Sequence, residues 1–260
     1  MGASPPLKEF NVKRFRSMAD IFTGALLLSL TPLALSGCGG SSIPYGAARV
    51  IHASSQAPNV DVTFGHAILA EGLPFGNAVG YVPVAAGTGM PLNIYAAGQD
   101  GIPVLTANSD LAANAVVSVF ALGQVSNLTP VVYAEDGIVD AAAPSSGSVK
   151  LRVVHGSYVA GPVDVYVTAP GTTLSASSVP TLSNFTFRAI TKYLTIPAGA
   201  YEVQVTAHGS LTPAITVPSV TLTSGQLYTA IAVDPTTTNP APGIVLINDP
   251  PVPTGTIAGP

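Results

Sequence analysis

One short pattern occurs twice in this chain, and it constrains the fold more than any other feature. Arg49-Val50-Ile51-His52 is followed by Val60-Asp61-Val62, and a close copy returns 103 positions later as Arg152-Val153-Val154-His155 and Val163-Asp164-Val165. Both fragments keep the same internal spacing, which a coincidence of composition does not produce. A repeat of this length indicates a duplicated domain, so we expect two similar units in tandem.

Short apolar runs separated by turn residues fill both units. Only 8% of the residues are charged, against about a quarter in an average protein, and Thr, Ser, Ala, Val, Gly and Pro take their place. β-branched residues suit a pleated surface, and Gly and Pro punctuate it, so this composition favours strands over long helices. About seven short runs per unit are typical of a sandwich. The sequence therefore predicts an all-β fold with two tandem immunoglobulin-like antiparallel β-sandwich domains.

Composition divides the chain into six expected segments. They are a lipoprotein signal peptide (1–37), a lipidated Cys with a flexible tether (38–46), a first sandwich (47–138), a linker (139–148), a second sandwich (149–249) and a disordered Pro/Gly-rich tail (250–260). We expect residues 47–137 and 149–249 to fold independently.

From Tyr201 to His208 polar and apolar residues alternate, which predicts a strand with one wet face. The Ser/Thr-rich insert 169–189 is expected to be a mobile loop.

The first 37 residues have the features of a targeting segment. A basic cluster, Lys8, Lys13, Arg14 and Arg16, precedes an apolar run from Ile21 to Leu35. The run spans 15 residues, which is short for a bilayer crossing and suitable for the core of a signal peptide.

The segment Leu35-Ser36-Gly37-Cys38 resembles the lipobox of bacterial lipoproteins. The resemblance implies cleavage before Cys38 and acylation of this residue, whose several acyl chains would give stable anchoring where one chain is marginal. Gly39 stands where an inner-membrane retention signal usually has Asp, which favours the outer membrane in a cell that has one. A plain signal peptide with an incidental Cys and an uncleaved anchor helix remain as alternatives.

Charge and cysteine content exclude several classes of protein. Of nine basic and thirteen acidic residues, four basic and two acidic precede Cys38, which leaves the mature part with a net charge of −6. A mildly acidic surface cannot neutralise phosphates, so nucleic acid is not an expected partner. The single Cys excludes an intrachain disulfide.

The repeated polar residues are candidates for a site. Ser54, His52 and Asp61 supply the residue types of a hydrolytic triad, but alternation sends the His toward the apolar side of its strand and the Asp the other way. We therefore expect structural roles for the repeated set, with each His hydrogen-bonded near a strand end and each Asp capping a turn or pairing with an Arg. This set consists of Arg49, His52, Asp61, Arg152, His155 and Asp164.

No cofactor, metal or catalytic site is expected. The four His show no close ligand spacing, and no carboxylate cluster resembles a calcium loop. There is no Trp for a carbohydrate-binding face, and most Tyr residues suit core or cross-strand packing. Tyr158, in an expected loop, is the best candidate for an exposed binding residue.

The opening motif, with Ala57-Pro58 before Val60, resembles the start of the DUF4397 domain. The second copy departs from it, with Gly156-Ser157-Tyr158 after the His. The family is bacterial, usually secreted or lipidated and often tandem, and it supplies no catalytic residues.

The leading hypothesis is a non-enzymatic, structural or adhesive module held on the envelope membrane by its lipid, with an envelope protein or glycan as partner. The alternative is a glycan- or peptide-binding protein that uses sandwich loops; a hydrolase is third. The sequence does not fix the oligomeric state.

Overall fold

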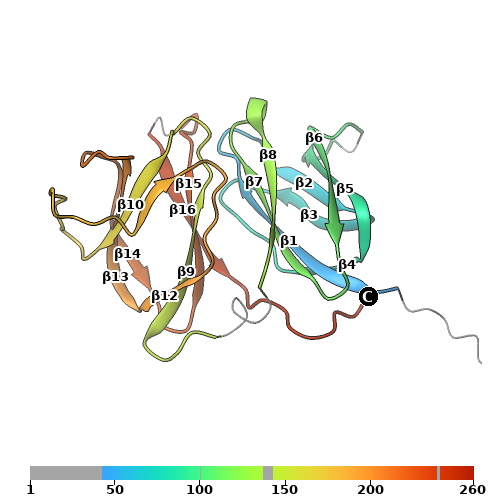
Figure 1. Cartoon of the computed structure of the whole chain (residues 1–260). Helices are drawn as coiled ribbons and strands as arrows, with labels where there is room; N and C mark the ends of the chain where they lie inside the picture. The colour runs from blue at the N-terminus through green and yellow to red at the C-terminus, as the bar shows by residue number, and fades with distance from the viewer. Residues whose placement is uncertain (1–42, 100, 137–142, 239–240) are drawn as a thin grey trace, which may run out of the picture. The chain divides into compact units, whose positions relative to one another are not determined.

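The computed structural model describes residues 43–99, 101–136, 143–238 and 241–260 (Figure 1). The expected signal peptide, the lipobox with Cys38, and part of the linker lie outside these residues. No helix long and apolar enough to cross a membrane occurs in the described part of the chain.

The described chain is all-β, as predicted, with eight strands in each unit where about seven were expected. The strands of the first unit are β1 (Tyr45–Ala53), β2 (Val60–Phe64), β3 (Ala67–Leu73), β4 (Val82–Ala85), β5 (Gly87–Ala96), β6 (Leu105–Leu111), β7 (Val116–Leu122) and β8 (Thr129–Ala134), with a short 3-10 turn η1 (Val125–Asn127). Those of the second are β9 (Ser148–His155), β10 (Val163–Thr168), β11 (Leu182–Phe185), β12 (Leu194–Pro197), β13 (Gly199–Ala207), β14 (Pro213–Leu222), β15 (Leu227–Val233) and β16 (Gly243–Asp249). This confirms two tandem β-sandwiches.

Each sandwich consists of two four-stranded sheets with the same strand order in both units. The sheet that carries the repeated His, here called the His sheet, has the order β4-β1-β7-β8 in the first sandwich and β12-β9-β15-β16 in the second. The sheet that carries the repeated Asp, the Asp sheet, has the order β3-β2-β5-β6 and β11-β10-β13-β14. The sheets are antiparallel, as predicted, except at one place in each unit, where β1 pairs with β7, and β9 with β15, in parallel.

The central strands of the His sheets are buried on both faces. In β1 the inward face packs in the core of its own sandwich, while Ile51 and Ala53 point outward into a second apolar cluster. That cluster joins the two sandwiches; its buried members are Ile51, Ala53, Phe120, Leu122, Val154, Ile231, Val233 and Ile247. Burial on both faces means that charged residues of these strands, such as Arg49 of β1 and Arg152 of β9, are buried as well.

The outer face of the second Asp sheet is covered, so the prediction of a wet face on β13 is wrong. Glu202 and Gln204 are buried although they are polar, because the insert 169–189 crosses over them. Gly171 N donates to Glu202 Oε2 at 2.6 Å, and Gln204 Nε2 donates to Thr172 O at 2.7 Å. The insert expected to be mobile is thus tied to the sheet, and it contains the short strand β11.

The segment expected to be a disordered tail returns to the first sandwich. Val252 is 4% exposed and packs with Ala47 and Val116, at the start of β1 and β7. Further on, Ile257 N donates to Asn114 Oδ1 at 2.9 Å. The structure thus differs from the expectation, because this segment packs against the first sandwich after the last strand of the second.

Candidate functional site: a buried ionic network

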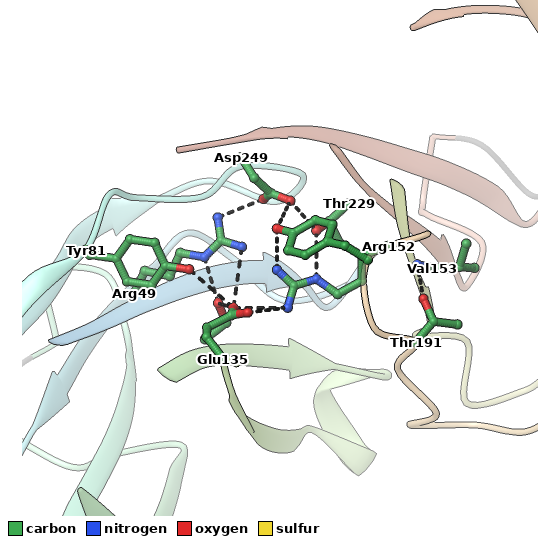
Figure 2. Close-up of polar contacts among 10 residues, drawn as sticks. Arg49, Tyr81, Glu135, Arg152, Val153, Thr191, Thr229 and Asp249 are labelled. Atoms are coloured by element: carbon green, nitrogen blue, oxygen red, sulfur yellow. Dashed lines mark hydrogen bonds and ion pairs between the residues drawn. The ribbon is translucent and has the colours of Figure 1, made fainter. Parts of the chain in front are cut away.

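The repeated arginines meet between the two His sheets (Figure 2). Arg49 projects from β1 on the face opposite the core, and its side chain is fully buried. Its Nε donates to Ser118 Oγ of the neighbouring strand β7 at 2.7 Å, and its Nη1 donates to Asp249 Oδ1 at 2.7 Å. Ser118 belongs to the same sandwich as Arg49, whereas Asp249 belongs to the other. The arginine therefore links the two units.

Arg152 repeats this arrangement with the units exchanged. Its Nε donates to Thr229 Oγ1 of β15 at 3.3 Å, within its own sandwich. Its Nη1 reaches the first sandwich and donates to both carboxylate oxygens of Glu135, at 3.0 and 2.9 Å. The pairing register makes Ser118 equivalent to Thr229, and Glu135 equivalent to Asp249. The two ion pairs are thus related as in an isologous interface, in which equivalent patches contact each other.

Hydroxyl groups satisfy the two carboxylates from within their own sandwich. Glu135 accepts from Ser118 Oγ at 2.5 Å and from Tyr81 OH at 3.3 Å. Asp249 accepts from Thr229 Oγ1 at 2.5 Å and from Tyr193 OH at 2.7 Å. Because buried charges are costly unless they are paired and hydrogen-bonded, this second set of contacts is what allows the ion pairs to lie in the interior.

The tyrosine rings also face the guanidinium groups. The Cζ atom of Arg49 lies 5.1 Å from the ring centroid of Tyr81, and that of Arg152 lies 4.2 Å from the ring centroid of Tyr193. Such contacts attract a cation to the face of the ring, more strongly where water is excluded. Each Tyr therefore contacts an arginine through its ring face and a carboxylate through its hydroxyl.

Burial and charge act against each other on these groups. Burial alone would lower the pKa of Arg152, but the nearby Glu135 carboxylate outweighs it, so the pKa is raised above the ordinary range. Burial raises the pKa of Glu135, and Arg152 opposes that shift. Burial likewise raises the pKa values of Tyr81 and Tyr193. The two tyrosines therefore stay protonated and donate their hydroxyl hydrogens to the carboxylates.

The repeated His residues lie inside the sandwiches and contact backbone. His52 Nε2 lies 3.0 Å from Pro58 O, and its Nδ1 lies 3.4 Å from Ser54 N. His155 Nε2 lies 3.1 Å from Gly161 O. Each ring thus fixes the loop that connects its strand to the following strand, β2 or β10.

The repeated Asp residues lie on the other sheet and cap turns. Asp61 accepts from Gly72 N at 2.5 Å and from Gly98 N at 3.0 Å. Asp164 accepts from Ser183, Asn184, His208 and Gly209 at 2.9 Å each. Burial of Asp164 acts to raise its pKa, but these hydrogen bonds prevail and lower it. The arginines bond other carboxylates, and neither hydrogen bond of His52 goes to Asp61, so the residue types of the triad are not brought together.

Tyr158 lies in the loop after β9 and is 46% exposed. Its ring packs edge-on against Phe187 at 5.5 Å, and its backbone N donates to Asp234 Oδ2 at 3.1 Å. Asp234 also accepts from Val159 N at 3.1 Å and from the hydroxyl of Ser157. Asp234 was missed by sequence reasoning. Hydrogen bonds to Asp234 thus hold this loop in place. No cluster of His, Cys, Asp and Glu suited to a metal occurs within the described ranges.

Sequence reasoning singled out the two arginines but not their partners. Tyr81 and Tyr193 stand at matching places in the two units, each directly before a strand. Glu135 and Asp249 also match, since Glu135 directly follows β8 and Asp249 ends β16. A search for polar residues that recur in both units would have found these pairs. It would not have shown that each arginine bonds the carboxylate of the other unit.

The fold and this network define a tandem β-sandwich protein in which the duplicated units pack through equivalent faces. The family model for the domain of unknown function DUF4397 matches residues 46–166 and 167–258, so the chain belongs to that family. This confirms the resemblance seen in the opening motif. The boundary between the two matches falls within β10, whereas the structural repeat starts again at β9. No curated protein matches the sequence.

Proposed function

We propose that this protein is a non-enzymatic structural or adhesive module of the bacterial envelope, held on the membrane by acyl chains on Cys38. The observation that carries the structural part is the network between the His sheets. Its four charged side chains are fully buried and paired with one another: Arg49, Glu135, Arg152 and Asp249. Side chains paired in this way hold the two units together and are not accessible to a substrate.

The anchoring part rests on the sequence. The basic start, the apolar run and the small residues before Cys38 agree with a lipoprotein leader. A lipid anchor would hold two tied sandwiches near the membrane surface. An envelope protein or a glycan remains the expected partner, and the outer membrane the expected site in a cell with two membranes.

Anchoring is tested by replacing Cys38 with Ala in the full chain. We expect the variant to leave the membrane fraction or to stay unprocessed, and to lose labelling by an alkyne analogue of palmitate. Ser42→Ala is the matched control, because it changes a small residue four positions after Cys38. Unchanged partitioning and mass for Cys38→Ala would contradict the anchor.

The non-enzymatic part is tested in cells that lack the protein. The measured property is envelope resistance to detergent after complementation with the parent or with the double variant His52→Gln/His155→Gln. If the role is structural, a folded double variant at parental abundance should restore resistance fully. Loss of resistance despite normal folding and abundance would favour the hydrolase hypothesis.

A further inference from the structure

The second sandwich has an apolar cleft between its two sheets. A cleft of ≈ 550 Å³ opens beside His155 and is lined by Val163 and Val205 of the Asp sheet and Ala232 of the His sheet. Two smaller pockets, of ≈ 30 and ≈ 70 Å³, continue between the same sheets and share lining residues such as Val203 and Ala230. The space is therefore widest at the loop end of the sandwich, near Gly161 and His208, and narrows toward the interior between the sheets.

Smaller side chains line the interior part of this space in the second unit. The repeat spacing and the pairing of β2 with β5, and of β10 with β13, make Phe64, Leu92 and Ile94 equivalent to Val167, Val203 and Val205. The pairing of β1 with β7, and of β9 with β15, makes Val119 equivalent to Ala230. At all four positions the second sandwich has a smaller side chain than the first. Leu151 and Tyr228, larger than the equivalent Ala48 and Val117, restore only part of the lost volume.

Apolar residues of the second sandwich are accordingly left in contact with solvent. Phe64, Leu92 and Ile94 are 0% exposed in the first sandwich. In the second, Val167 and Val203 are half-buried, and Leu246, which lines the same space, is 39% exposed. Buried apolar residues form one cluster across the first sandwich, but separate clusters in the second. An interior is normally close-packed, so an apolar molecule would complete this one.

His155 supplies one polar group at the wide end of the cleft. Its Nε2 faces the carbonyl oxygen of Gly161, which can only accept, so Nε2 carries the hydrogen. Burial lowers the pKa of His155, which keeps the ring neutral and leaves Nδ1 as an acceptor. This buried Nδ1 has no hydrogen-bond partner, whereas the equivalent atom of His52 lies 3.4 Å from Ser54 N. Of the two repeated His residues, His155 thus is the one with a free acceptor nitrogen.

We propose that this cleft binds one amphipathic molecule, with its unbranched hydrocarbon chain between the sheets and a hydroxyl group donating to His155 Nδ1. The volume lies within the range of roughly 300–1,000 Å³ that is usual for small-molecule sites. No Lys or Arg lines the cleft, which disfavours a free carboxylate or phosphate as the head group. The ligand class is therefore a neutral aliphatic alcohol, free or as the glycerol ester of a fatty acid.

The test uses residues 39–260, which include the compact unit 42–260. Decan-1-ol is titrated calorimetrically against decyl methyl ether, which has the same chain but no hydroxyl hydrogen. We expect saturable binding of one alcohol per chain, and about fivefold weaker binding of the ether, as the loss of one hydrogen bond implies. Monodecanoylglycerol in a third titration separates the ester from the free alcohol. Absence of saturable binding of both the alcohol and the ester to the folded chain would overturn the proposal.

The cleft is then filled with the residues of the first sandwich. The triple variant Val203→Leu, Val205→Ile and Ala230→Val copies Leu92, Ile94 and Val119, and should abolish binding without lowering the thermal midpoint. Val179→Leu is the control, since Val179 is 85% exposed and outside the cleft. If the triple variant misfolds, Ala230→Val alone should still weaken binding at least tenfold. Parental affinity in the folded filled variant would show that the ligand binds elsewhere.

His155→Phe separates the polar contact from the chain site. It keeps an aromatic ring but removes the acceptor, so decan-1-ol and decyl methyl ether should bind with equal affinity. A retained preference for the alcohol in this folded variant would place the hydroxyl contact elsewhere and overturn that part of the proposal.

Discussion

Arg49 Nη1 lies 2.7 Å from Asp249 Oδ1, although the two residues are 200 positions apart and belong to different sandwiches. Arg152 and Glu135 form the equivalent pair in the opposite sense, with Nη1 2.9 Å from Oε2. Each unit thus contributes one cation and one anion to the other. Duplication of a domain that paired with a second copy of itself would produce this crossed arrangement, because an isologous contact uses one patch twice.

Removing one charge of a pair should be costly. We expect Arg49→Met to lower the free energy of unfolding by about 3–5 kcal/mol, because Asp249 would stay buried without its counter-ion. The measurement is a urea unfolding curve of residues 39–260. The double variant Arg49→Met/Asp249→Leu should lose less than the sum of the two single variants. Strict additivity would show that the pair is not coupled.

An exposed ion pair provides the matched control for Arg49. Lys192 Nζ lies 3.5 Å from Asp136 Oδ2, and the Lys side chain is 67% exposed. Lys192→Met should therefore change the free energy of unfolding by less than about 1 kcal/mol. If Lys192→Met and Arg49→Met lowered the free energy of unfolding equally, burial would not determine how much an ion pair contributes to stability.

The repeated His in the second sandwich should matter for stability. His155→Ala removes a buried ring and its contact with Gly161 O, and we expect it to lower the free energy of unfolding by about 1–2 kcal/mol. Ser177→Ala, in an exposed part of the insert, should have almost no effect. Denaturant midpoints of the two variants decide this. Parental stability of His155→Ala would contradict a structural role.

Acidification should destabilise the fold through protonation of the two repeated His rings, His52 and His155. Burial lowers the pKa values of His52 and His155 below the ordinary 6.5, so the unfolded chain takes up protons at a pH where the folded chain does not. Their contribution is present above about pH 6.5 and is lost as the pH falls through that value toward the folded pKa. Thermal midpoints between pH 7.5 and 5 should fall, and His155→Gln should reduce the slope. A flat profile for the parent would contradict the shift.

The sequence predicted those parts of the fold that local pattern determines. Val163 to Val165 repeats Val60 to Val62 at the same offset, and both segments form strands, because alternation and turn residues act over a few positions. The face of β13 was misjudged, since Glu202 is covered by Gly171, which lies 31 positions away, and no local pattern contains that contact. The sequence predicted that His52 faces the apolar side of β1, but not that the opposite face is buried as well.

The network and the cleft were harder to predict for different reasons. Pairing of Arg49 with Asp249 depends on how two finished sandwiches meet, which no segment of the sequence specifies. The cleft depends on a difference in volume between equivalent residues, such as Phe64 and Val167. That difference can be read from the repeat itself, but its effect requires the register of the opposite sheet.

The C-terminal segment should stabilise the first sandwich. Deleting residues 252–260 removes Val252, which is 4% exposed against Ala47 and Val116. We expect a loss of about 1–3 kcal/mol, as for exposing one buried aliphatic side chain and its neighbours. Val252→Ser should reproduce much of this loss, whereas deleting 258–260 should not. If deletion of 252–260 leaves the unfolding midpoint unchanged, the packed segment does not contribute to stability.

The interface between the two His sheets predicts how the sandwiches behave when they are separated. The expectation that residues 47–137 and 149–249 fold independently took no account of a shared face. Ile51 and Phe120, each 0% exposed, would meet water in an isolated first half, and Glu135 would lose Arg152. We therefore expect fragments 39–140 and 141–260 to unfold at lower denaturant than the joined chain, and to recover stability as a one-to-one complex when mixed. Arg152→Met in the second fragment should weaken this association, whereas Lys192→Met should not. If each fragment alone matched the midpoint of the joined chain and the two did not associate, the interface would be dispensable.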